Sequence, residues 1–469
     1  MARCYSRWHQ VLFCVCSPCI CLILLFLYAS IMVCIDMNKM TIHSIQSDHF
    51  VASGSFTNKS YTSLPKTFWK LHEDAFWNQL QVAIDRHFNP ILNPQNTKTG
   101  IKNNDFYDYL LRLSFSEVTD LESMRKKLEQ LPQQLQDFVS NMKRRTYPVI
   151  RQPANSTCGA GAADEQEPPL LLLAIKTTEL NFKQRHAIRR TWGQVGWVAT
   201  KKKNGNGRQE VGGYVRRVFL MGKENPEDLG VDVSKLLQIE GQHYGDIVQW
   251  DFSDTFFNLT LKDVLFWSWY LRSCSQIRFV FKGDDDVFVN TPSMIAYLHE
   301  QLGMPHAEQT MNEFMVGHVI GAASPIRLNH SKYFVPDCLF KGLYPTYAGG
   351  GGVVYSGRLV KRLHDMSRRV HLFPIDDVFV GMCMSRLNAA PIHHPAFLTF
   401  DFSQKEAMDP CAYHKILLVH KRSPTQLIAL WDDMSKTKNQ CWNVSLRVSD
   451  NETTITETTK MKLNQPNRI

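Results

Sequence analysis

The sequence lacks a concentrated run of basic residues, although lysine and arginine outnumber aspartate and glutamate by 53 to 44. That absence argues against nucleic acid as a partner. It also lacks internal repeats and a second uncharged stretch long enough to span a membrane, and its six cysteines after residue 34 form no CxxC pair and no cysteine–histidine zinc spacing. With 44% hydrophobic and 11% aromatic residues, the composition excludes a disordered chain, a collagen, a coiled coil and a polytopic membrane protein.

One uncharged stretch does occur, at residues 11–34. Its 24 residues exceed the apolar core of a signal peptide, and a membrane-spanning helix needs about 20. Because Arg3 and Arg7 precede the stretch, the positive-inside bias predicts a cytosolic tail at 1–10, a transmembrane signal-anchor at 11–34 and a lumenal body. A cleaved signal peptide with an over-long core is the alternative.

Two features favour a lumenal, oxidising compartment. Six N-glycosylation sequons follow the stretch, at Asn58, Asn155, Asn258, Asn329, Asn443 and Asn451. Six of the twelve cysteines also follow it and can form disulfides there, but the sequence leaves fifteen complete pairings open. Cys383, inside the helical pattern GMCMSRL, is interpreted as a buried thiol.

The residue composition divides the lumenal body into four segments. They are a polar stem at 35–66, a small helical region at 67–160, an α/β domain at 168–441 and a polar tail at 442–469. In the α/β domain, apolar strand candidates (LLLLAIK, YVRRVFLMG, IRFVFK, FMVGHVI) alternate with helical stretches, which predicts a mostly parallel sheet flanked by helices. TKKKNGNGRQEVGG is interpreted as a basic surface loop.

Three adjacent carboxylates, Asp284, Asp285 and Asp286, follow the strand candidate IRFVFK. In α/β sheets, ligands bind outside the carboxyl ends of strands. Because neighbouring carboxylates repel one another, a cation should offset them; hard oxygen ligands suit Mn²⁺ or Mg²⁺, which in turn bind phosphate oxygens. A solvated acidic turn is the alternative.

A second acidic pair, Asp376 and Asp377, opens a predicted helix. Carboxylates there face the positive end of the helix dipole, so simple capping is the alternative to a functional role. Between the two acidic points, YPTYAGGGGVVYSG contains two rings that could stack on a sugar, Tyr344 and Tyr347. Four glycines that permit close backbone approach to a ligand follow them: Gly349, Gly350, Gly351 and Gly352.

Seven motifs occur in order across residues 168–435: RHAIRRTWG, VFLMG, YGDIVQWDFSDTFFNLTLK, FKGDDDVFVN, YPTYAGGGG, PIDDVFVGMC and LLVHKRSP. Together they resemble the animal Golgi β1,3-glycosyltransferase family. The AGGGG form and an FWN segment resemble most closely its β1,3-N-acetylglucosaminyltransferase branch. The resemblance implies a GT-A-type nucleotide-sugar-binding fold, a Mn²⁺-dependent (or Mg²⁺-dependent) inverting reaction, and UDP-GlcNAc as donor.

The resemblance also implies roles for the acidic residues. Asp286 is expected to bind the metal, and Asp284 to lie near both the metal and the ribose and uracil. Asp285 belongs to the same motif and is assigned to the nucleotide. Asp377 aligns with the catalytic base and Asp376 with its less directly involved neighbour. Tyr347 and the four glycines are expected to line the substrate site.

Basic and imidazole side chains complete the expected site. Arg185 and Arg189 match basic positions placed for the nucleotide, and the planar guanidinium suits phosphate; surface charge on a helix is the alternative. His420 is the candidate for a metal ligand near the C-terminus, in competition with His393 and His394.

The leading expectation is an enzyme of the Golgi membrane that transfers N-acetylglucosamine to a galactose-terminated glycan, as in poly-N-acetyllactosamine elongation. A β1,3-galactosyltransferase of the same fold and a non-catalytic Golgi partner of other transferases are the alternatives. A homodimer or a heteromer with other transferases stays open. His318 stands where the family often has an acidic residue, which leaves the details of acceptor recognition open.

Overall fold

The computed structural model describes residues 75–88, 114–116, 118, 121–158, 168–204 and 207–448, all within the compact unit Phe50–Ile469. The expected anchor at 11–34, the stem at 35–66 and the sequons at Asn58 and Asn451 lie outside these residues. Among the described helices, none has the length and apolar character needed to cross a membrane.

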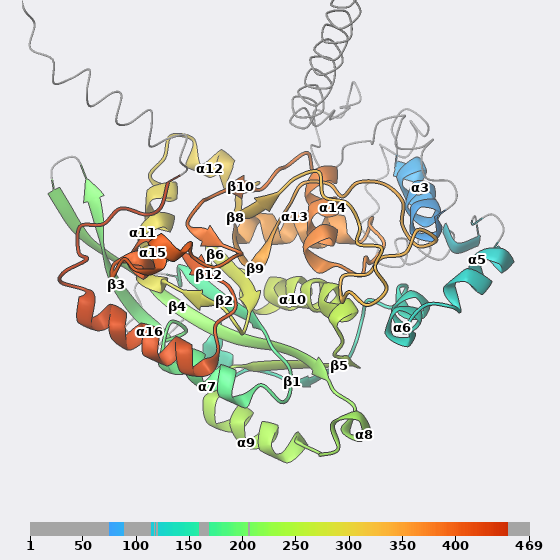
Figure 1. Ribbon diagram of the computed structural model, residues 1–469, viewed down its shortest axis with the longest axis horizontal. Helices are drawn as coiled ribbons and strands as arrows, with labels where there is room; N and C mark the ends of the chain where they lie inside the picture. Colours follow the sequence, from blue (N-terminus) through green and yellow to red (C-terminus); the bar gives the residue numbers. More distant parts are fainter. Residues whose placement is uncertain are drawn as a thin grey trace, which may run out of the picture. The chain divides into compact units, whose positions relative to one another are not determined.

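A large mixed sheet forms the centre of the described chain (Figure 1). Its order is β1-β5-β4-β2-β6-β9-β8-β10, with β3 beside β4, and a small second sheet has the order β11-β12-β7. The strands are β1 Val149–Arg151, β2 Leu171–Lys176, β3 Gly196–Asn204, β4 Gly207–Lys223, β5 Ile247–Ser253, β6 Phe279–Asp284, β7 Phe288–Val289, β8 Met315–Ile320, β9 Tyr347–Ser356, β10 Ile392–His393, β11 Phe397–Leu398 and β12 Leu418–Val419.

Helices cover the sheet and extend from it. They are α3 Phe76–Phe88, α5 Leu121–Leu128, α6 Gln133–Asn141, α7 Phe182–Arg190, α8 Pro226–Leu229, α9 Ser234–Tyr244, α10 Leu259–Ser273, α11 Thr291–Leu302, α12 Ala307–Thr310, α13 Gly357–Ser367, α14 Asp376–Arg386, α15 Gln404–Ala407 and α16 Pro424–Thr437. The described residues also include the short 3₁₀ helices η3 Asn155–Thr157, η4 Phe256–Asn258 and η5 Ala412–Lys415.

Strand β2 shows why helices lie on both faces. All six of its residues are buried, and because successive side chains point to opposite faces, they alternate between two hydrophobic cores. Leu172 and Ala174 join the core that includes α10, α13 and α14, whereas Leu171 and Leu173 join the core that includes α7, α11 and α16. The continuous apolar run LLLLAIK therefore predicted this buried central strand correctly.

The expectation of a mostly parallel sheet is corrected by the pairing. In the main sheet of the described residues, four of the eight pairings are antiparallel: β1–β5, β3–β4, β6–β9 and β8–β9. The parallel part is confined to β5-β4-β2-β6 and the edge pair β8–β10. Apolar runs mark buried strands in either direction, so hydrophobicity alone could not reveal that β9 runs against β6.

The basic segment interpreted as a surface loop is also corrected, because most of it is a β-hairpin. β3 pairs with β4 along its whole length, from Gly196 opposite Val215 to Asn204 opposite Gly207. The sequence did contain a signal for this, since a Gly-Asn doublet stands between Asn204 and Gly207 and such doublets favour two-residue hairpin connections.

Helix α3 is tied to the sheet-flanking helices by buried polar contacts. The indole nitrogen of Trp77 donates a hydrogen bond to the carbonyl of Leu372 at 3.0 Å. Asp85 receives two hydrogen bonds from the guanidinium of Arg386, at 3.0 and 2.6 Å, and neither residue is more than 3% exposed. Arg386 is the last residue of α14, so this pair joins α3 directly to α14.

Two disulfides resolve part of the open cysteine question. Cys158 pairs with Cys274 and Cys411 with Cys441, while Cys338 and Cys383 remain thiols. Cys383 is fully buried, which confirms its interpretation as an interior thiol.

The sequons that the structure describes differ in accessibility, which yields a prediction. Asn155, Asn329 and Asn443 are exposed, whereas Asn258 is half-buried and its side-chain amide donates a hydrogen bond to the Ser253 carbonyl at 2.8 Å. We expect Asn155→Gln and Asn329→Gln each to remove one glycan mass from the cellular full-length protein, and Asn258→Gln to remove none. Gel mobility before and after glycosidase treatment checks this. A complete absence of glycans would contradict the lumenal orientation itself.

Candidate active site

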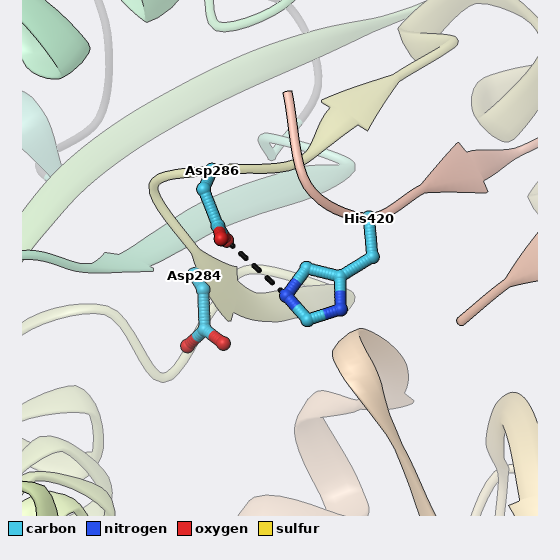
Figure 2. A group of neighbouring side chains, drawn as sticks. All are labelled: Asp284, Asp286 and His420. Carbon is cyan, nitrogen blue, oxygen red and sulfur yellow. Dashed lines mark ion pairs between the residues drawn. The ribbon is translucent and has the colours of Figure 1, made fainter. Parts of the chain in front are cut away.

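The end of β6 carries a candidate metal site. Ligand atoms of Asp284, Asp286 and His420 all lie within 4.8 Å of one another (Figure 2). The Nε2 atom of His420 is 3.3 Å from Oδ1 of Asp286. That oxygen is buried. Two carboxylates and one imidazole suit Mn²⁺ or Mg²⁺, so the donor set fits the expected divalent ion.

The charges in this cluster are unbalanced without a cation. Burial raises the pKa of Asp284 to about 6, and the nearby Asp376 and Asp286 add to the increase. Burial also acts to raise the pKa of Asp286, but hydrogen bonding and charge from His420 hold it below its usual range. The hydrogen bond with Asp286 in turn raises the pKa of His420. The imidazole of His420 therefore offsets negative charge on Asp286 that a bound metal ion would otherwise offset.

The two competing histidines, His393 and His394, do not belong to the metal cluster. His393 and His394 each use Nδ1 to accept a backbone hydrogen bond, from Val319 and Ala396 respectively, at 3.1 Å in both cases. The structure therefore brings His420, and neither competitor, to the two aspartates. Asp285 points elsewhere: its Oδ2 accepts hydrogen bonds from Thr177 at 2.5 Å and Asn181 at 2.8 Å.

Arg422 holds the segment that presents His420. Its backbone N–H donates to the carbonyl of Asp286 at 2.6 Å, and its guanidinium donates to the carbonyl of His420 at 3.1 Å and to Asp401 at 2.5 Å. Lys421 between them has a φ of 61°, a conformation that is costly for a residue with a side chain. Arg422 therefore stabilises a strained turn that places the imidazole beside Asp286.

Asp376 and Asp377 begin α14 as predicted, but buried lysines accompany them. Lys176, at the end of β2, forms ion pairs with Asp376 and, at 3.0 Å, with Asp263 of α10. Lys282 of β6 lies 3.1 Å from Asp263, 3.8 Å from Asp376 and 3.6 Å from Asp377. Asp376 is thus held between two ammonium groups, whereas Asp377 is reached by only one.

This asymmetry gives the two carboxyl groups different proton affinities. Burial acts to raise the pKa of Asp376, but Lys176 and Lys282 lower it far below its usual range. Burial and the charge of Asp376 raise the pKa of Asp377 to about 7, although Lys282 opposes the increase. A carboxyl group that exchanges its proton near neutral pH is suited to general base catalysis. The geometry therefore favours Asp377 over Asp376 for that role.

The four glycines connect the acidic pair with the metal cluster. A Cβ on Gly349 would lie 3.0 Å from Oδ2 of Asp377, and one on Gly351 would lie 2.8 Å from the ring of His420. Gly350 and Gly351 have φ values of 89° and 91°, which favour glycine. A Cβ on Gly350 would overlap the hydroxyl of Thr399, and one on Gly352 would contact Leu418. The close approach that these glycines permit is therefore largely to protein atoms.

The two tyrosines expected to stack on a sugar differ. Tyr344 is only 8% exposed and packs edge-on against Phe373, so its ring belongs to the core. Tyr347 is half-buried, and burial together with the charge of Asp377 raises the pKa of its phenol. Only Tyr347 remains available at the site.

The expected nucleotide ligands Arg185 and Arg189 are occupied internally. Arg185 is fully buried and donates to both oxygens of Glu240, at 2.9 and 2.7 Å. Arg189 donates to both oxygens of Asp246, at 2.9 and 2.8 Å. The geometry gives no support to direct nucleotide binding by these arginines, and we assign them a structural role in joining α7 to α9 and the residue that precedes β5.

Sequence reasoning missed Lys176, Lys282 and Asp263. Lys176 is the last residue of the apolar strand β2, Lys282 directly follows the apolar residues that begin β6, and Asp263 is fully buried within helix α10. A charged residue inside such a run requires a partner, which was the available signal.

The mixed sheet, the metal-fitting cluster at a strand end and the acidic pair beside it define the class of protein: a glycosyltransferase. The chain belongs to the β1,3-glycosyltransferase family, and residues 183–395 match the family model described as Galactosyltransferase. This confirms the resemblance found in the sequence.

Several curated relatives agree. The chain is 37% identical over 416 residues to human N-acetyllactosaminide beta-1,3-N-acetylglucosaminyltransferase 2, covering 86% of this chain and 96% of the relative. It is 38% identical over 313 residues to mouse N-acetyllactosaminide beta-1,3-N-acetylglucosaminyltransferase 4, covering 66% and 81%. It is 40% identical over 267 residues to rat UDP-GlcNAc:betaGal beta-1,3-N-acetylglucosaminyltransferase 7, covering 56% and 63%.

The metal cluster generates a prediction. Asp286→Asn preserves size but removes a charged oxygen ligand, so the affinity of the full-length protein for Mn²⁺ should fall by about tenfold or more. Because the ion would also hold the diphosphate, affinity for UDP should fall in parallel. Calorimetric titration measures both. Asp432→Asn, the same change at an exposed position of α16, is the matched control, and equal behaviour of the two variants would refute the metal assignment.

Proposed function

We propose that this protein is an inverting UDP-GlcNAc-dependent β1,3-N-acetylglucosaminyltransferase. Its acceptor is the 3-hydroxyl of a terminal β-galactose on glycoprotein or glycolipid glycans, as in poly-N-acetyllactosamine elongation. The observation that carries the proposal is similarity along most of the chain to relatives named for this reaction. The arrangement of Asp284, Asp286, His420 and Asp377 supplies the chemistry that the reaction needs.

The proposed mechanism follows from which side chains lie at each end of the glycine run of β9. Asp284, Asp286 and His420 would hold Mn²⁺ or Mg²⁺, which when bound offsets negative charge on the departing diphosphate. At the other end of the glycine run, Asp377 lies beside Gly349. There Asp377 accepts the proton of the acceptor hydroxyl as that oxygen attacks the anomeric carbon. A single displacement inverts the α linkage of the donor to β.

The proposal extends to architecture. We assign residues 168–441 to a GT-A-type catalytic domain and 67–160 to a helical region beside it, with an anchor at 11–34 that keeps the catalytic domain in the Golgi lumen. The two disulfides between described cysteines support an oxidising compartment.

Donor and acceptor screening tests the activity. Purified full-length protein with Mn²⁺ should transfer sugar from UDP-GlcNAc to N-acetyllactosamine, and product digestion and linkage analysis should show a β1,3 bond. UDP-galactose is the matched donor. Preferential transfer of galactose would establish the alternative galactosyltransferase, and inactivity with every donor would favour a non-catalytic partner.

The acidic pair provides a sharper test. Asp377→Asn removes the base but leaves the Lys176–Asp376 pair intact, so the rate should fall by about 10²–10⁴-fold with UDP affinity and melting temperature nearly unchanged. Asp376→Asn should instead lower stability, by a magnitude on the order of 3 kcal/mol, because it removes one partner of a buried ion pair. Kinetics and thermal unfolding separate the two effects. If Asp376→Asn is the variant that loses rate without losing stability, the roles are reversed.

The assignment of Asp377 as the base also predicts how the rate depends on pH. The base must be deprotonated to act, and the pKa of Asp377 lies at about 7. With Mn²⁺ and both substrates saturating, the wild-type rate should therefore fall as pH decreases below about 7. In Asp377→Asn the residual rate should lose this acidic dependence.

A further inference from the structure

The surface beside the proposed base, Asp377, includes residues of β8 and β10, which come after β9 in the order of the sheet. His318 of β8 pairs directly with Gly349 of β9. Directly opposed residues of an antiparallel pair project to the same face of a sheet. Because a Cβ on Gly349 would point at Oδ2 of Asp377, the side chain of His318 projects to the face on which Asp377 lies.

The order of strands separates this surface from the metal cluster. In the sequence β6-β9-β8, Asp284 ends β6 on one side of the glycine strand, while His318 lies on β8 on the other side. A base must contact the acceptor hydroxyl, whereas the ion that the metal cluster would hold must lie at the donor diphosphate. The side of β9 that carries His318 is therefore the side from which the acceptor reaches Asp377.

An exposed aromatic ring adjoins His318. The ring of Phe400 lies edge-on to His318 with centroids 6.3 Å apart, and the ring of His393 lies edge-on at 5.3 Å. Phe400 is 76% exposed, although the residue before it, Thr399, packs against the glycine run where a Cβ on Gly350 would overlap it. The backbone of Phe400 is therefore held beside the site, while its phenyl ring faces solvent.

His318 offers a polar group at the same place. Burial and the charge of His393 lower the pKa of His318, so its imidazole is neutral at physiological pH. A hydrogen bond with the backbone of Phe397 employs one ring nitrogen as the donor. In a neutral imidazole the other nitrogen is an acceptor, which suits a sugar hydroxyl. Sugar sites combine such a group with an apolar platform.

We propose that His318 and Phe400 form the acceptor subsite, in which a galactose-terminated glycan rests an apolar sugar face on Phe400 and donates a hydroxyl hydrogen bond to His318. The inference rests on the proposed function in taking a β-galactoside as the acceptor, Asp377 as the base and the metal cluster as the donor side. Neither residue belongs to the metal cluster of the described residues, so we expect donor binding not to depend on them.

The test measures acceptor binding separately from turnover. N-acetyllactosamine is titrated into full-length protein saturated with Mn²⁺ and UDP, and its affinity should fall about tenfold in Phe400→Ala, the usual worth of an aromatic contact. Affinity for UDP and the melting temperature should not change, since the ring is exposed. Phe400→Trp should restore acceptor binding. Ile239→Ala, which truncates a 63% exposed side chain on α9, is the matched control.

His318→Phe tests the polar half of the subsite. It keeps a ring against Phe400 but removes the acceptor nitrogen, so acceptor affinity should fall while UDP affinity is retained. In assays of transfer, both substitutions should raise the KM for acceptor and leave the KM for donor unchanged.

The outcomes distinguish this inference from the proposed function. Wild-type transfer to galactosides together with unchanged acceptor affinity in Phe400→Ala would overturn the subsite and leave the function intact. Wild-type protein that binds N-acetyllactosamine through Phe400 but transfers no GlcNAc would support the subsite and overturn the proposed reaction. Loss of UDP affinity in Phe400→Ala would place the ring on the donor side and overturn the assignment.

Discussion

The site depends on two ammonium groups buried in the centre of the sheet. Lys176 and Lys282 lie on the adjacent strands β2 and β6, and both contact Asp263 of α10. Charges that are removed from water are costly unless they are paired, so these contacts fix the distance between the sheet and α10. Asp376 of α14 supplies the remaining counter-charge. Two cations and two anions balance, so Asp377 is left as an additional carboxyl group, and burial together with the charge of Asp376 raises its pKa.

The glycine strand extends this constraint across the sheet. Since β9 lies between β6 and β8 in the sheet, its backbone lies between the metal cluster and the proposed acceptor subsite. Side chains in the run would displace Asp377, Thr399 or His420. The absence of Cβ atoms therefore determines how near the proposed base and the proposed metal ligands can be, and not merely how near a ligand can come.

Local patterns in the sequence predicted much of this arrangement. The apolar run of β2, the strand before Asp284 and the helix beginning at Asp376 each depend on neighbours within a few residues. The choice of His420 among three histidines could not be made in the same way, because it depends on a turn held by Arg422 and on a contact with a residue far earlier in the chain.

Ion pairs between residues that lie far apart in the sequence could not be predicted from local patterns. Lys176 and Asp376 are separated by 200 residues, and nothing in the local composition pairs them. The same limit explains Arg185, whose residue type suits phosphate but whose carboxylate partner, Glu240, lies on another helix. Strand direction is equally hidden, because a buried strand is apolar whichever way its neighbours run.

The bidentate contact between Asp85 and Arg386 has a consequence for where the enzyme can be shortened. Arg386 ends the helix that begins with the acidic pair, and its partner comes from α3, 301 residues earlier. A fragment that starts after Phe88 would retain every proposed residue of the active site yet remove the carboxylate that neutralises the buried guanidinium of Arg386. Helix α3 is therefore an integral part of the cooperative folding unit, and the natural place for variation in length lies N-terminal to it.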